Sequence, residues 1–243
     1  MKSLPTYFCI LSIGLLQFYS LSAQSDSLSG YGGIRELAEK LYGPDPDLLN
    51  GQKYNYTYRS AEGSPFFEVY GHEASSIQIK GKLYDEQWIM FDIYKQLVIL
   101  DFTDVSGARG SIVLNDEWID YFNIGRAHFR KFPDKLGNER FGQALSLDNI
   151  SCVYFWKKHY QYELKNGRKY YRFSKPVKEA VIIRGGQVYG YNNKKSFLKC
   201  FLEKDRKTIK MQMKEHRIQL KKVSDMEMES LMKYINQLQA YGD

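Results

Sequence analysis

The chain has 243 residues, a formal net charge of +7 and 43% hydrophobic residues. This length is sufficient for one large or two small domains, each with a hydrophobic core. With only three cysteines, the chain does not depend on a disulfide scaffold.

The first 23 residues have the pattern of a secretory signal peptide. Lys2 supplies a positive charge, residues 7–21 form an uncharged and mostly apolar stretch, and the small pair Ser22-Ala23 precedes Gln24. The stretch is interrupted by polar residues, whereas a transmembrane helix needs about 20 apolar residues. We therefore expect cleavage near Ala23, a mature chain without a transmembrane span, and a location in the periplasm or outside the cell.

The mature chain divides into three regions of different periodicity. Residues 24–49 form a leader, in which apolar residues spaced three and four apart predict a short amphipathic helix over 34–41. Residues 50–191 alternate between apolar or aromatic and polar side chains, which is typical of strands. Turn dipeptides between these runs predict β-hairpins, namely Lys95-Gln96, Asn166-Gly167 and Gly185-Gly186.

Residues 192–243 return to the helical period and predict a basic tail of three short helices. Asn193 and Asp205 are the expected N-caps of the first two helices, and Ser224 with Glu227 forms a capping box before the third. Because each helix is apolar on one side only, the tail is expected to pack on the β-domain. The predicted fold class is α+β: an antiparallel β-rich body, built as a curved meander, half-barrel or sandwich, followed by this tail.

Two cysteines, Cys152 and Cys200, remain after cleavage of the signal peptide. Export to an oxidising compartment allows a disulfide between them. The alternative is that both are small buried apolar residues, because Cys152 lies in an apolar strand and Cys200 beside the apolar stripe of a helix. Both interpretations stay open at this point.

No sequence motif predicts catalysis, a metal site or a cofactor. The four histidines are widely separated, and the spacings of zinc sites, phosphate-binding loops and nucleophile elbows are absent from the sequence. Asp116, Glu117 and Asp120 form the one carboxylate cluster that acid/base chemistry would use. A cluster of this size is expected by chance in so acidic a region, so we predict no catalytic residue and no cofactor.

Four segments resemble a family of exported proteins from Bacteroidota-type bacteria. They are NGQKY at 50–54, GSPFF at 63–67, GKLYDEQWIMFDIYKQLVIL at 81–100 and GGQVYGYNNKKSFLKCF at 185–201. The resemblance implies a β-rich region with a strand, D-x-Y-turn, strand element, a lysine-rich helical tail, and a periplasmic or cell-envelope location. It provides no catalytic residue, because the shared motifs are turns, strand cores and helix caps.

Positive charge is concentrated in residues 157–222, which contain 20 Lys or Arg against five Asp or Glu, a net charge of +15. Such a block creates a positive potential on the face that it covers. It is interpreted as a solvated surface, as a docking surface for anionic lipid head groups, or as a nucleic-acid surface. Nucleic acid ranks last because an exported protein rarely meets it.

We therefore expect an exported, non-enzymatic envelope protein that acts as an interaction or scaffold module, with anionic lipid or an envelope protein as its partner. The candidate residues for binding an anionic surface are Lys194, Lys195, Lys199, Arg206, Lys207 and Lys210. One alternative is a carrier that binds an apolar or glycan ligand in a curved sheet. The other alternative is a hydrolase.

Overall fold

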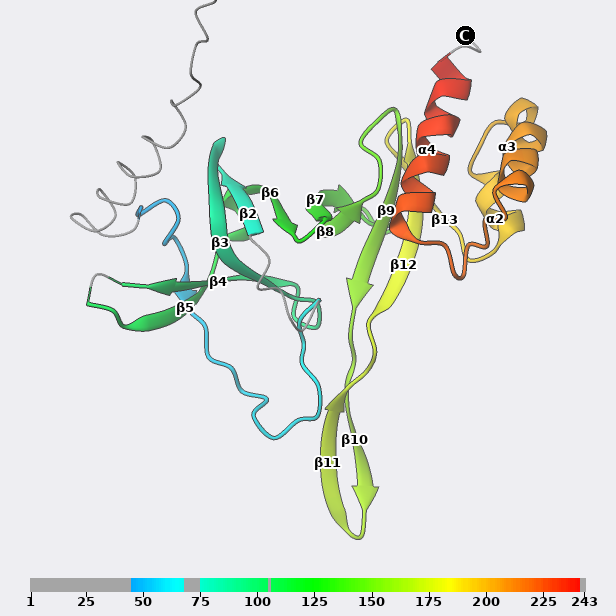
Figure 1. Ribbon diagram of the computed structural model, residues 1–243. Coiled ribbons are helices and arrows are strands. Elements are labelled where there is room, and N and C mark those ends of the chain that lie inside the picture. Colours follow the sequence, from blue (N-terminus) through cyan, green and yellow to red (C-terminus); the bar gives the residue numbers. More distant parts are fainter. Residues whose placement is uncertain (1–44, 68–74, 105, 241–243) are drawn as a thin grey trace, which may run out of the picture.

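The computed structural model describes residues 45–67, 75–104 and 106–240. The predicted signal peptide, the predicted leader helix over 34–41 and His72 lie outside these residues. The described chain is mostly antiparallel β-structure followed by three helices, which confirms the predicted α+β class (Figure 1).

Eleven strands form one open sheet in the order β1-β5-β4-β3-β2-β6-β7-β8-β9-β12-β13, and β10 pairs with β11 in a separate hairpin. The first strands are β1 (Gln52–Lys53), β2 (Ser75–Ile79), β3 (Lys82–Asp92), β4 (Leu97–Thr103), β5 (Arg109–Val113), β6 (Ile119–Ile124) and β7 (Ala127–Pro133). The remaining strands are β8 (Glu139–Ala144), β9 (Ile150–Lys157), β10 (Tyr160–Lys165), β11 (Arg168–Phe173), β12 (Val177–Arg184) and β13 (Gln187–Gly190). The helices are the 3-10 helix η1 (Asp116–Trp118) and the α-helices α2 (Lys194–Lys199), α3 (Glu203–Glu215) and α4 (Asp225–Ala240).

The predicted meander is interrupted at three places. β1 pairs with β5 and not with β2, the next strand in the chain. After β5 the chain returns past β4 and β3, so that β6 pairs with β2, with Ile77 opposite Phe122. After β9 the chain leaves the sheet as the β10–β11 hairpin and re-enters it at β12, which pairs with β9. The hairpin projects from the sheet in the direction opposite to the helices (Figure 1).

The predicted hairpin turns are present, and positive φ angles explain their sequences. Asn166 and Gly167 have φ of 51° and 74°, and Gly185 and Gly186 have φ of 55° and 75°. Asn and Gly tolerate this left-handed region, which a two-residue hairpin turn requires. The third turn is longer than the predicted Lys95-Gln96 pair, because β3 ends at Asp92 and β4 begins at Leu97.

The alternation of Tyr54, Tyr56 and Tyr58 predicts a strand that the structure does not contain. β1 ends at Lys53, and only the backbone N–H of Tyr54 continues its pairing, by donating to the Ser111 carbonyl at 2.8 Å. Tyr56 stacks on Phe66 instead, and Tyr58 packs in an aromatic cluster at the base of the β10–β11 hairpin. Tertiary aromatic contacts therefore replace strand pairing along this segment.

Two of the three predicted helix caps are correct. Asn193 caps α2 by accepting from the Ser196 N–H, and Ser224 with Glu227 forms the capping box of α4. The predicted cap of the second helix is wrong, because α3 begins at Glu203 and Asp205 lies inside it, 7% exposed. Its side chain is therefore on the buried side of the helix.

Three clusters of buried hydrophobic residues lie on the sheet, and the smallest consists of Phe132, Val153, Phe155 and Val181. The first includes Ile77, Phe91, Phe122 and Phe141 and extends from β2 to β8. The second joins β9 and β12 to the apolar sides of the three helices, as the packed tail predicts. Within the described chain, no helix is both long and apolar enough to cross a membrane.

Candidate functional site

The outer side of α2 and α3 carries a cluster of lysines, which we call the basic face: Lys194, Lys195, Lys199, Lys207, Lys210 and Lys214. All six are exposed, and none makes an ion pair or a side-chain hydrogen bond with a described residue. Ile209 and Met213 bury the opposite side of α3. The helical period therefore separates the apolar side of α3 from its lysines.

Five of the six predicted surface-binding residues belong to the basic face, and Arg206 does not. Arg206 is half-buried, and its Nε donates to the Phe201 carbonyl at 3.1 Å. The structure adds Lys214, which lies one helical turn from Lys210 on α3. Sequence spacing alone would have found Lys214 once the start of α3 was known.

Two apolar side chains lie among these lysines. Met211 is 56% exposed on the outer side of α3, and Leu202 is 43% exposed directly before the helix. Exposed apolar side chains surrounded by Lys are typical of segments that rest on a membrane interface. The basic face thus combines positive charge with apolar groups.

The positive block of the sequence is not wholly a surface feature. Lys158 is only 7% exposed, and its Nζ donates to the carbonyls of Ser64 at 3.0 Å and Phe66 at 2.5 Å. Burial lowers the pKa of Lys158, and the negative charge of Asp92 partly opposes that shift. Lys178 is half-buried and places its Nζ 3.9 Å from the centre of the Tyr154 ring. Both lysines therefore contact interior groups and are not part of an exposed basic surface.

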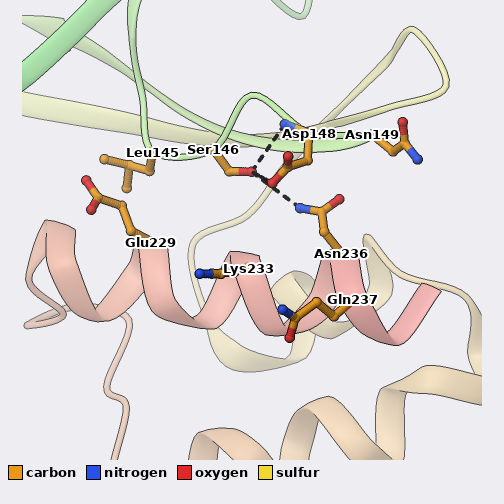
Figure 2. Close-up of a pocket in the computed structure, with 8 residues that line it drawn as sticks. All are labelled: Leu145, Ser146, Asp148, Asn149, Glu229, Lys233, Asn236 and Gln237. Carbon is orange, nitrogen blue, oxygen red and sulfur yellow. Dashed lines mark hydrogen bonds between the residues drawn. The ribbon is translucent and has the colours of Figure 1, made fainter. Parts of the chain in front are cut away.

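A groove of about 630 Å³ runs between α4 and the β8–β9 connection (Figure 2). Glu229, Lys233, Asn236 and Gln237 line it from α4, and Leu145, Ser146, Asp148 and Asn149 line it from the connection. Asn236 donates to Ser146 Oγ at 3.3 Å and to the Ile150 carbonyl at 2.9 Å. These contacts hold α4 on the sheet, so the polar centre of the groove has a structural role.

The candidate disulfide between Cys152 and Cys200 is not present in the structure. Both residues are free thiols, buried in the second core. Cys152 Sγ lies 3.5 Å from the hydroxyl of Tyr191, and Cys200 Sγ donates to the Ser196 carbonyl at 3.3 Å. Burial raises the pKa of Cys152 to about 12 and that of Cys200 to about 11, so both thiols remain protonated.

The acidic cluster has structural partners. Asp116 lies in η1 and pairs with Lys131 at 3.5 Å. Asp120 lies in β6 and accepts from the Gly81 N–H at 2.7 Å. Asp116 and Asp120 therefore belong to different elements and do not follow one another along one face of a strand.

His128 Nδ1 lies 2.8 Å from Asn123 Oδ1, and burial lowers the pKa of His128. Among the described residues, no group of three or more His, Cys, Asp or Glu side chains is arranged to bind a metal ion.

Comparisons with protein-family models, curated proteins and solved structures find no match for this chain. The resemblance to exported proteins of Bacteroidota-type bacteria therefore stays an expectation.

Proposed function

We propose that this protein is an envelope interaction module that docks on the anionic surface of a membrane through the basic face. The observation that carries the proposal is the set of six exposed lysines on α2 and α3, which make no ion pair with described residues. Unpaired surface charges of one sign are complementary to anionic phospholipid head groups.

The binding free energy expected from several exposed lysines favours a membrane surface over a small anion as the partner. A basic residue held near an anionic membrane contributes about 1 kcal/mol, so several lysines acting together give measurable binding without a pocket. Exposed Met211 and Leu202 add apolar groups that can enter the interface. The export signal and the envelope location are part of this proposal, because they supply the membrane that the basic face would meet.

The test is co-sedimentation with lipid vesicles. The protein should bind vesicles that contain phosphatidylglycerol and should not bind vesicles of phosphatidylcholine alone. Because salt screens exposed charges over about 10 Å at 0.1 M, binding should weaken as the salt concentration rises. Replacing all six lysines of the basic face by Glu should abolish binding.

A matched control separates the basic face from net charge. It reverses six exposed basic residues elsewhere, so that both variants have the same net charge: Lys53, Arg59, Lys95, Lys157, Arg168 and Lys175. This control should retain most of the binding, because its substitutions lie away from α2 and α3. Equal loss of binding in the two variants, or no binding at low salt, would rule out docking through the basic face.

A further inference from the structure

A cavity of about 540 Å³ lies on the side of β3, β4 and β5 that is turned away from the first core. Ile89 of β3 and Leu100 of β4 point into that core. Since side chains alternate along a strand, their neighbours Trp88 and Asp101 point to the opposite face, where the cavity lies. The strands that carry the cavity, β3, β4 and β5, lie far from α2 and α3 (Figure 1), so the cavity is independent of the basic face.

Strand register builds one wall of the cavity as a straight row. Trp88 is opposite Asp101, and Asp101 is opposite Ser111, so these three side chains share one face of β3, β4 and β5. Tyr54 continues the row, because its N–H bonds to the Ser111 carbonyl. Arg109 lies two residues from Ser111 on the same face of β5.

Two buried polar atoms in the lining of this cavity have no hydrogen-bond partner. Tyr54 Oη and Asp101 Oδ1 are buried without a hydrogen bond. Arg109 makes no ion pair with a described residue, although it lines the same cavity as the Asp101 carboxylate. Buried polar atoms without partners are uncommon in folded proteins, and each requires an explanation.

The chemistry of the lining selects the class of ligand. Asp101 disfavours an anion, whereas Lys53 and Arg109 disfavour a cation, so a neutral molecule with several hydroxyl groups fits all three. Trp88 is 53% exposed and offers an aromatic surface. A sugar ring has one apolar face of C–H groups and hydroxyls around its edge, which match an aromatic platform beside a carboxylate and a guanidinium.

We propose that this cavity is a carbohydrate-binding site. A pyranose ring stacks on Trp88, its hydroxyls donate to the Asp101 carboxylate, and Arg109 donates to the ring substituents. The volume of about 540 Å³ falls within the range of ligand pockets and accommodates roughly one or two sugar rings.

The experiment is saturation-transfer NMR and isothermal calorimetry with three probes: maltohexaose, cellohexaose and chitohexaose. At least one should bind, with a Kd on the order of 1 mM or below. Trp88→Ala should weaken binding at least about tenfold by removing the platform. Asp101→Asn should also weaken it about tenfold by removing a charged acceptor, whereas Trp88→Phe should retain part of the affinity.

Tyr162→Ala is the matched control, because Tyr162 is similarly exposed, at 54%, on the β10–β11 hairpin outside the cavity. This variant should bind the sugar as the wild type does. Circular dichroism and thermal unfolding of each variant separate loss of the site from loss of the fold. The proposal is overturned if none of the three probes binds, or if binding persists unchanged in folded Trp88→Ala.

Discussion

Asn236 of α4 satisfies both backbone polar groups of Ile150 in β9. The Ile150 N–H donates to Asn236 Oδ1 at 2.9 Å, and Asn236 Nδ2 donates back to the Ile150 carbonyl at 2.9 Å. This reciprocal contact joins residues 86 positions apart and fixes α4 at the start of β9, between β8 and β12 in the sheet. The Asn236 side chain thus makes the pair of hydrogen bonds to Ile150 that the backbone of a neighbouring strand could make.

Asn236→Ala should destabilise the protein by about 1–3 kcal/mol, because it leaves the N–H of buried Ile150 without its side-chain partner and leaves the Ile150 carbonyl with only the Ser146 hydroxyl. Urea denaturation of both proteins measures the difference. Gln237→Ala is the control, since Gln237 is exposed and lines the same groove without a hydrogen bond to β9, and it should change the stability by less than about 0.5 kcal/mol. Equal effects of the two substitutions would contradict the structural role of Asn236.

Gly142→Ala should destabilise the protein by about 1–3 kcal/mol through crowding. A Cβ at this position would lie 2.5 Å from Val153 Cγ1 and 3.1 Å from Phe155 Cε1, and both side chains are fully buried. Gly142→Ala should cost less stability in a Val153→Ala background than in the wild type, because the smaller side chain leaves room for the new Cβ. A double-mutant cycle by thermal or urea unfolding measures this difference.

Gly190→Ala is the matched control for Gly142→Ala. Its Cβ would meet the end of the Lys135 side chain, which is flexible and can move aside. We therefore expect a change of less than about 1 kcal/mol. A larger loss at Gly190 than at Gly142 would contradict the packing at the β8–β9 pair.

Asp92 should give stability a specific pH dependence. Burial raises the pKa of Asp92, although its Oδ1 accepts the N–H groups of Tyr94 and Lys95 in the turn after β3. Because the pKa is higher in the folded state, ionised Asp92 opposes folding at neutral pH. This free-energy cost decreases as the pH falls through the pKa of Asp92 in the folded state. It is absent below the pKa of about 3.9 in the unfolded state, where Asp92 is protonated in both states.

Asp92→Asn keeps an acceptor oxygen for the turn and removes the charge. The variant should be at least as stable as the wild type at about pH 7. As the pH falls to about 4, the free energy of unfolding of the wild type should increase relative to that of the variant. Urea denaturation across this range measures the difference, with Asp85→Asn, an exposed carboxylate on the same strand, as the control. A difference that stays constant with pH would show that burial does not raise the pKa of Asp92.

Cys152 and Cys200 should not react with a thiol reagent such as DTNB in the folded protein at about pH 8, because the thiolate is the reactive form and burial holds both pKa values well above this pH. The measurement uses a Cys9→Ser chain, so that only these two thiols are counted. Both should react after unfolding in guanidinium without reductant. Fewer than two reactive thiols in that state would indicate a disulfide.

Local interactions explain the parts of the fold that were predictable. The Asn166-Gly167 turn depends on the φ preferences of two adjacent residues, and the capping box of α4 depends on Ser224 and Glu227, three positions apart. The hydrophobic stripe of α4 similarly repeats within a few turns. The lysines of the basic face followed from the same helical period, because an amphipathic helix that packs on a sheet must turn its charged side outward.

The sequence by itself therefore determined the α+β class, the hairpin turns and the exposed lysines, because neighbouring residues decide each of these. Only the tertiary structure decided that β6 lies beside β2, that Lys158 is buried against Ser64 and Phe66, and that Asn236 binds Ile150. It also brought Trp88, Asp101 and Ser111 into one row. The physical reason is that these contacts join residues distant in the chain, and burial and strand register select them only when the whole sheet forms.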